Sequence, residues 1–314
     1  MTKIRPLSAF AAAFALPAAL AAQPIAAQDT IVVEGERIET ADVRSTARDI
    51  TVGSQATQVP LARFQRPICP GVWGLSGTNA QMVLDRIAAN AIAADVPVEE
   101  EADCGANVWV ILVDDVAATF DQLEEDDSFL TRHLTPYQLR KVRSQEGSAR
   151  GWNLITSRNP DTGERLPSGF ELAGAFQEAL NNGEPPPVNE ISRMSRLDLG
   201  IRTDIELSVV LIERSAIADL DAHAVADYAT MRLLAYVEPP SRESIVSTVL
   251  TLFEPVEGEF APQRMTAFDQ AYLRALYRSS PTRPARIALG NISGLMEDLD
   301  DAEDAEDAEN VQER

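Results

Sequence analysis

The sequence predicts an α+β fold, in which one domain over residues 60–296 has a small mixed sheet packed by several helices. Three observations predict it. The run "ANVWVILVDD", which ends at Asp115, is apolar and of strand length, as expected of a strand buried on both faces. A strand, a helix and a strand follow one another within residues 69–115, which is the spacing of a right-handed parallel crossover. Further along the chain, several segments have the apolar spacing of helices.

The first predicted strand is "CPGVWGL", residues 69–75, and a helix follows it after a short turn. We expect Thr78 to cap this helix and Gln81 to complete a capping box, because the two residues are three positions apart. The apolar face of the helix is expected to include Met82, Ile87 and Ala91.

Two cysteines, Cys69 and Cys104, lie at the N-terminal ends of the two strands in this crossover. Neighbouring strand ends and an even count in an exported chain predict a disulfide, and the alternative is two buried free thiols. A bridge closing this loop would stabilise the fold by roughly 3–4 kcal/mol in the chain-entropy model. A catalytic cysteine would need His133 or His223 as its base, and two cysteines and two histidines without close spacing do not predict a zinc knuckle.

The middle of the chain continues with alternating helix and strand patterns. Thr135 followed by proline predicts a helix start, and this helix should run to about Glu146. "GWNLITSR", residues 151–158, is predicted to be a strand, and residues 170–183 a helix ended by asparagine and glycine. "EPPPVNE", residues 184–190, is predicted to be a stiff connector.

The second strong strand signal is "TDIELSVVLIER", residues 203–214. Period-2 alternation predicts one apolar face for it, with Glu206 and Ser208 beginning the other face. The expected apolar face consists of Ile205, Leu207, Val209 and Leu211. Helical patterns follow, and they predict helices over residues 221–235, 243–253, 266–278 and 285–296.

Both ends of the chain are predicted to lie outside the domain. Residues 1–27 have the positive start, apolar run and small-residue cleavage site of a signal peptide, cut near Ala21 or Ala27. The alternative is a buried N-terminal helix, and the apolar run is too short to span a membrane. Residues 28–59 are expected to be a disordered lead-in, and the acidic repeat within residues 297–314 a disordered tail. "IVVEGER" in the lead-in resembles the segment after the signal peptide in exported alphaproteobacterial proteins, including TonB-dependent receptors.

The net charge of −22 limits the classes of partner. Nucleic acid and anionic membrane surfaces would both repel a chain this acidic, so neither is expected to bind it. No cofactor motif occurs. The tail lacks the glycine and closing glutamate of an EF-hand loop, so only weak, diffuse calcium binding is expected there. The signal peptide places the mature chain in the periplasm or the medium.

One helix carries a candidate metal site. His223 and Asp227 are four residues apart, which puts them on one helix face, as two metal ligands require. In the H-E-x-x-H arrangement the general base would stand at the position of Ala224, and no third ligand is evident. The alternative, which the sequence favours, is a structural helix capped by Asp221 with an exposed histidine.

This end of the chain also carries a family resemblance. The strand "IELSVVLIER", the helix "VADYATMRLLA" and "MTAFDQAYLRALY" resemble the C-terminal half of a family of uncharacterised exported bacterial proteins grouped with zincin-like peptidases. The resemblance implies a zincin-like scaffold and hydrolase descent. Where that family has paired glutamates and a glutamine, this chain has Ala229, Thr230 and Arg232, so no catalytic residue is carried over.

Two further positions are candidates. Ser76 stands between Gly74 and Gly77 as in a nucleophile elbow, but a threonine replaces the last glycine of that motif, and turn and capping duties also explain it. Asp114 and Asp115 follow a buried strand, where open α/β sheets bind ligands, and one of them could equally cap the next helix.

These observations lead to one functional hypothesis and two alternatives. The first is an exported, non-catalytic protein that binds an unknown protein or envelope component, because no complete catalytic set occurs. The alternatives are a hydrolase of degenerate zincin-like descent, and a protein that acts through calcium or partner binding by its acidic tail.

Overall fold

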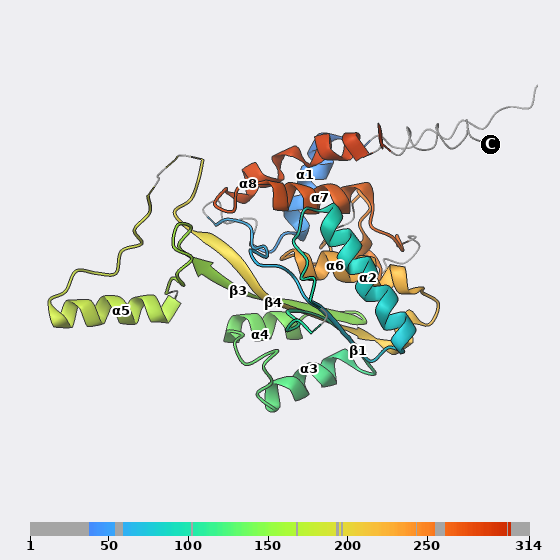
Figure 1. The fold of residues 1–314 in the computed structure, drawn as a ribbon, viewed down its shortest axis with the longest axis horizontal. Helices are drawn as coiled ribbons and strands as arrows, with labels where there is room; N and C mark the ends of the chain where they lie inside the picture. The colour runs from blue at the N-terminus through green and yellow to red at the C-terminus, as the bar shows by residue number, and fades with distance from the viewer. Residues whose placement is uncertain are drawn as a thin grey trace, which may run out of the picture. The chain divides into compact units, whose positions relative to one another are not determined.

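The computed structural model describes residues 38–53, 59–101, 103–167, 169–192, 195, 197–242, 244–254, 261–299 and 301–302. The predicted signal peptide and most of the predicted tail lie outside these residues. In the described part of the chain, eight α-helices and a four-stranded mixed sheet form an α+β fold, which confirms the predicted class (Figure 1).

The sheet has the strand order β1-β2-β4-β3. Its strands are β1 (Pro70–Trp73), β2 (Val108–Val113), β3 (Ala149–Arg158) and β4 (Arg202–Glu213). β1 pairs with β2 in parallel, as the predicted crossover requires, and β2 also pairs with β4 in parallel. β3 is antiparallel to β4 and forms the other edge. The sheet therefore contains one parallel pair more than the sequence predicted.

The predicted single apolar face of β4 is wrong at its first member. The register of β3 and β4 shifts between the pairs Leu154–Leu207 and Ile155–Ile205, so Glu206 is an extra residue on β4. A bulge of this kind reverses the alternation of side chains beyond it. As a result Ile205 packs into one core cluster, and Leu207 packs with the other.

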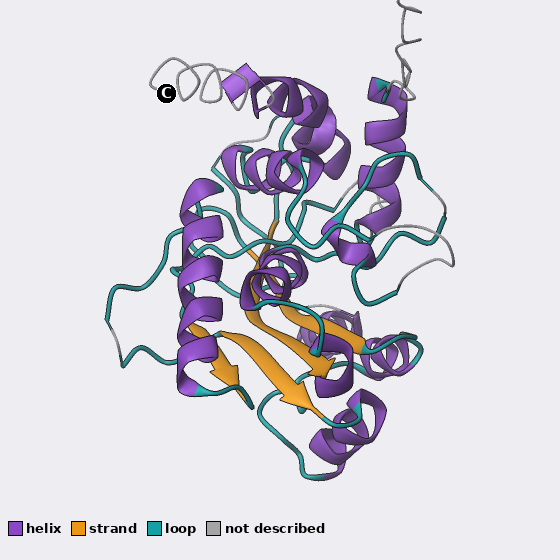
Figure 2. Ribbon diagram, turned by 90° about the vertical axis from the view of Figure 1, so that its right-hand side faces the viewer, coloured by secondary structure: helices purple, strands orange, loops and turns teal. Residues whose placement is uncertain are grey.

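Helices cover both faces of the sheet (Figure 2). One face packs against α2 (Gly77–Ala93) and α6 (Ala222–Leu234), with α7 (Ala267–Arg278) contacting α6. The other face packs against α3 (Val116–Glu125) and α4 (Pro136–Arg143). α6 is buried along almost its whole length, from Ala224 to Leu234, because the sheet, α2 and α7 all surround it.

The start of α2 differs from the prediction. Ser76, not Thr78, is the N-cap residue, and its side chain makes no capping hydrogen bond. The buried face also differs from the prediction, since Val83 is buried and Met82 is 40% exposed, while Ile87 is buried as expected.

Part of the predicted disordered lead-in is folded, which corrects the predicted domain start at residue 60. Residues Thr40–Ile50 form the helix α1. Val43, Ala47 and Ile50 are spaced as one helix face and are buried in the main core cluster. The surrounding charged residues on the exposed face made this segment look like a polar linker.

The predicted helix over residues 243–253 is also wrong, since the described part of this segment contains only the 3₁₀ turn η2 (Val249–Thr251). The backbone N–H of Val249 donates to the carboxylate of Asp269 on α7, and so does the hydroxyl of Thr248. Thr248 and Val249, at the start of η2, therefore donate to a residue of α7 and not to a carbonyl oxygen within residues 243–253.

The last predicted helix is broken. It comprises α8 (Ala285–Ala288), the 3₁₀ turn η3 (Leu289–Asn291) and a helical stretch over residues 292–299, three residues beyond the predicted boundary. The expectation of calcium binding by the tail stays a prediction, because residues 303–314 lie outside the described residues.

The disulfide is confirmed. Cys69 and Cys104 are bonded, with their Cα atoms 6.1 Å apart, at the N-terminal ends of β1 and β2. This bond is consistent with an oxidising compartment outside the cytoplasm. None of the helices in the described residues has the length and apolar character needed to cross a membrane.

Local signals predicted two other helices correctly. Thr135 and Gln138 form a capping box at the start of α4, and Pro136 is its first residue. α5 (Gly169–Asn182) ends before Gly183, whose φ is +70°. α5 lies away from the sheet in Figure 1, and its Phe170 is 98% exposed.

Candidate functional site

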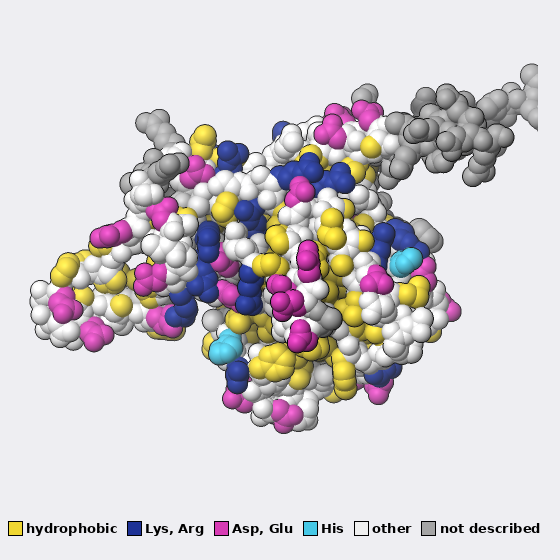
Figure 3. Space-filling view, viewed as in Figure 1, with side chains coloured by type: hydrophobic (Ala, Val, Ile, Leu, Met, Phe, Trp, Pro, Cys, Tyr) yellow, Lys and Arg dark blue, Asp and Glu magenta, His cyan; other side chains and the backbone are white. Residues whose placement is uncertain are grey.

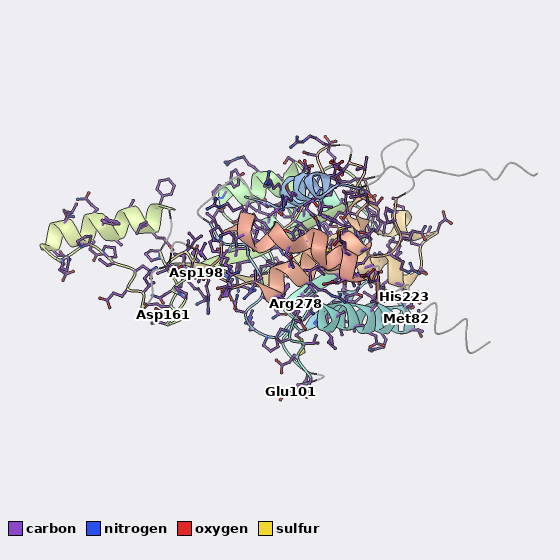
Figure 4. The ribbon with its side chains drawn as sticks, turned by 90° about the horizontal axis from the view of Figure 1, so that it is seen from above. Met82, Glu101, Asp161, Asp198, His223 and Arg278 are labelled. Atoms are coloured by element: carbon purple, nitrogen blue, oxygen red, sulfur yellow. A yellow bond between two sulfur atoms is a disulfide. The ribbon has the colours of Figure 1, made fainter. Side chains whose placement is uncertain are left out.

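The predicted metal pair on α6 is divided between solvent and core. His223, labelled in Figure 4, is exposed in the first turn of the helix, where Asp221 accepts a capping hydrogen bond from the N–H of Ala224 at 2.8 Å. Asp227, one turn further, is fully buried. The predicted cap by Asp221 and the predicted exposure of His223 are therefore confirmed.

The carboxylate of Asp227 is fully engaged by neighbouring donors. Arg86 on α2 donates from Nε to Oδ1 at 2.6 Å and from Nη2 to Oδ2 at 2.9 Å. Asn90 donates to Oδ1 at 2.8 Å, and the backbone N–H of Met265 donates to Oδ2 at 3.1 Å. The bidentate ion pair raises the pKa of Arg86. Asp227 thus ties α2 and the start of α7 to α6.

The histidines do not join a cluster of metal ligands. His133 and His223 are both exposed, and Figure 3 shows the two histidines at separate places on the surface. Within the described part of the chain, no group of three or more His, Cys, Asp or Glu side chains could hold a metal ion.

The candidates at the carboxyl ends of the parallel strands have structural roles. Asp115 caps α3 by accepting from the N–H of Ala118 at 2.8 Å, as the capping alternative predicted. Asp114 accepts from Arg214 at 3.1 Å and is 91% exposed. Ser76 is the N-cap residue of α2. The structure places these residues just after the carboxyl ends of the parallel strands β1 and β2.

Sequence reasoning did not predict the burial of Arg232 and Asp269. Arg232 on α6 is 2% exposed and donates to the carbonyl oxygens of Val237 and Gly151 and to Oε1 of Gln145. Asp269 on α7 is fully buried, and its burial raises its pKa to about 6, although Thr248 and Thr266 donate to it. The signal for Asp269 was Thr266 three residues before it, since these two form a capping box.

A pocket of about 280 Å³ lies between α1 and the α8–η3 segment. Three arginines line it: Arg44 and Arg48 on α1, and Arg286 on α8. We call it the arginine pocket; its other lining residues are Ala47, Ala285, Leu289 and Gly290. Its described lining contains no acidic side chain. Lys and Arg side chains gather at several places on the face seen in Figure 3, one of them over α7 and α8.

The helix geometry explains why the arginines meet. Arg44 and Arg48 are four residues apart on α1 and so lie on the same face, on either side of the buried Ala47. α1 contacts η3, which follows directly after the helix that carries Arg286. Among the described residues, neither Arg44 nor Arg286 has a hydrogen-bonding or ion-pair partner.

A second pocket of about 160 Å³, which we call the apolar pocket, adjoins the arginine pocket at Ala285. Its lining is mainly apolar and aromatic, with Leu61, Ile155, Tyr236, Tyr272, Leu276 and Ala285 among the residues that form it. Burial raises the pKa of Tyr236 to about 12, and burial also raises the pKa of Tyr272. Both phenols therefore remain neutral at physiological pH.

The sequence held only a weak signal for these pockets. The four-residue spacing of Arg44 and Arg48 was visible, but the segment was predicted to be a disordered lead-in. Arg286 lies more than 230 residues away, and nothing local connects it with α1.

Comparison with protein-family models, with curated proteins and with solved structures finds no match to this chain. The resemblance to zincin-like peptidases therefore stays a prediction.

Proposed function

We propose that this is an exported, non-catalytic binding protein, and that it binds an anionic group in the arginine pocket. One observation carries the proposal: guanidinium groups from two separate elements line one pocket that is without an acidic residue in its described lining. In a chain with a net charge of −22, guanidinium groups gathered at one place depart from the overall charge. Arg48 already has an interaction partner, so Arg44 and Arg286 are the two that carry the proposal.

Guanidinium groups suit this role for chemical reasons. Each is planar, always charged, and able to give two parallel hydrogen bonds to a carboxylate or phosphate. Arg44 and Arg286 have no described carboxylate partner that an incoming anion would have to displace. A pocket of about 280 Å³ is close to the lower end of the usual range for small-molecule sites, which favours a small ligand.

The signal-like N-terminus and the disulfide support export to the periplasm or the medium. The residues that suggested catalysis make structural contacts within the protein. Asp227 is held by Arg86, and Asp115 caps a helix. A binding protein needs neither residue to be reactive.

The test is calorimetric titration of the disulfide-bonded mature chain with inorganic phosphate and with methyl phosphate at low salt. We expect saturable binding that weakens as salt is added, because exposed charges are screened. The double variant Arg44→Gln, Arg286→Gln should weaken binding at least tenfold. The matched control is Arg140→Gln, an exposed arginine on α4 outside the pocket, which should bind as the wild type does.

Thermal unfolding midpoints should be alike in all three proteins, because the substituted arginines are exposed. Absence of saturable binding, or equal binding by the double variant and the wild type, would show that the arginine pocket is not an anion site.

A further inference from the structure

We propose that the ligand of the arginine pocket is an anionic amphiphile, whose charged head lies among the arginines and whose short alkyl chain lies in the apolar pocket. This inference rests on the proposed function and specifies its ligand class. It comes from the position of the two pockets, one cationic and one apolar, beside each other.

Two structural links join the pockets. Ala285 lines both of them. The chain at the end of α1 also contributes to both: Ala47 of α1 lines the arginine pocket, and Thr51, the residue that follows α1, lines the apolar pocket. The small side chain of Ala285 therefore lies between the two pockets.

Two polar side chains of the apolar pocket, Thr51 and Tyr272, are already bonded within the protein, whereas the buried hydroxyl of Thr203 has no hydrogen-bond partner among the described residues. The hydroxyl of Thr51 donates to the carbonyl oxygen of Ala47 at 2.5 Å and pairs with the hydroxyl of Tyr272 at 2.7 Å. Tyr236 stays uncharged, because burial raises its pKa to about 12. Water in this pocket gains few hydrogen bonds, so a hydrocarbon chain can replace it favourably.

The volumes limit the length of the ligand. The apolar pocket has about 160 Å³, which is the liquid volume of about five water molecules. This space suits a short chain and not the paired long chains of a membrane lipid. Single-chain phosphates and carboxylates share the required chemistry, whether they are free or released from a larger molecule.

The experiment is a titration of the mature protein with monomeric n-alkyl phosphates, from methyl to hexyl phosphate, below their critical micelle concentrations. We expect affinity to rise about fourfold for each added methylene until the apolar pocket is filled, since a buried methylene contributes about 0.8 kcal/mol. An alkyl alcohol of the same length should bind at least tenfold more weakly, because it lacks the charge.

A matched pair of variants separates the two pockets. Val59 lines the apolar pocket and is 43% exposed, so Val59→Gln should fold normally and should weaken hexyl phosphate at least threefold without changing methyl phosphate. Val188, which is 73% exposed and lies outside both pockets, provides the control Val188→Gln.

Arginine-dependent binding of methyl phosphate with no gain from longer chains would overturn this inference and leave the proposed function standing. Equal effects of Val59→Gln and Val188→Gln on hexyl phosphate would also overturn it. Sedimentation with phosphatidylglycerol vesicles tests the membrane as the source of the same chemistry. We expect no cosedimentation, and cosedimentation that depends on Arg44 and Arg286 would overturn the choice of a free amphiphile.

Discussion

The charged residues around α6 and those of the arginine pocket differ in their burial and in whether they have partners within the protein. Near α6, Asp227, Arg232 and Asp269 are almost or fully buried, and each is held by several protein groups. At the arginine pocket, Arg44 and Arg286 are exposed and have no described partner in the protein. Arg232 thus supports the fold near α6, whereas Arg44 and Arg286 can bind a ligand from solution.

This difference in burial indicates which charged residues support the fold and which can bind a ligand. A buried charge must be satisfied within the protein, because leaving it unpaired costs several kcal/mol. Such a residue supports the fold even where its sequence position suggests catalysis, as at Asp227. An exposed guanidinium beside a pocket costs little to leave unpaired, so it can bind a ligand from solution.

The largest effect is expected at Arg232. Replacing Arg232 with methionine would keep the apolar stem but leave the carbonyl oxygen of Val237 without its donor. It would also remove one of the two donors to the carbonyl oxygen of Gly151, which keeps the amide of Gln145. We expect Arg232→Met to lower the free energy of unfolding by about 3–5 kcal/mol. Urea denaturation followed by circular dichroism measures this, and Arg140→Met, which replaces an exposed arginine of α4, is the control. Equal losses of the free energy of unfolding in the two variants would show that a buried arginine contributes no more to stability here than an exposed one.

The second effect concerns Asp269 and pH. Its pKa is raised in the folded protein from 3.8 to about 6, chiefly by burial. The folded state therefore holds the proton more tightly than the unfolded state does. This contribution to stability is fully present below about pH 4 and is lost as the pH rises through about 6.

The shift corresponds to about 3 kcal/mol across this window. The measurement is the free energy of unfolding at several pH values for the wild type and for Asp269→Asn. Subtracting the two curves isolates Asp269, because other titrating groups contribute to both. A difference curve that is flat between pH 4 and 6.5, or one that slopes the opposite way, would contradict the prediction.

A smaller effect is expected at the ion pair of Arg86 and Asp227. Arg86→Ala removes two hydrogen bonds but leaves Asn90 and the N–H of Met265 as donors to Asp227. The side chain of Arg86 is also 35% exposed, so water replaces part of what is lost. We expect a loss of about 2 kcal/mol.

A double-mutant cycle with Asp227→Asn checks the cause of this loss. If the unpaired buried charge is responsible, Arg86→Ala should cost much less when Asp227 is already neutral. Additive losses would mean that packing between α2 and α6 explains the effect.

Local hydrogen bonding made several elements of this protein predictable. The capping box at Thr135 and the caps at Asp115 and Asp221 each involve residues three positions apart, so the pattern is present in the sequence itself. The disulfide followed from two cysteines at neighbouring strand ends.

Tertiary structure decided the remainder, because the deciding contacts join residues that are far apart in the chain. Asp269 takes the donors of Thr248 and Val249, and it thereby prevents the predicted helix there. α1 is a folded helix because three apolar residues among polar ones meet the core.

The sequence by itself determined the α+β class, the parallel crossover, the disulfide and the capped helix starts, because these depend on neighbours along the chain or on strand order. Only the tertiary structure decided that Asp227 is a buried ion-pair partner of Arg86, and that Arg286 lies across a pocket from Arg44. A carboxylate or a guanidinium has no fixed role until packing sets its solvation, and packing is a property of the whole fold.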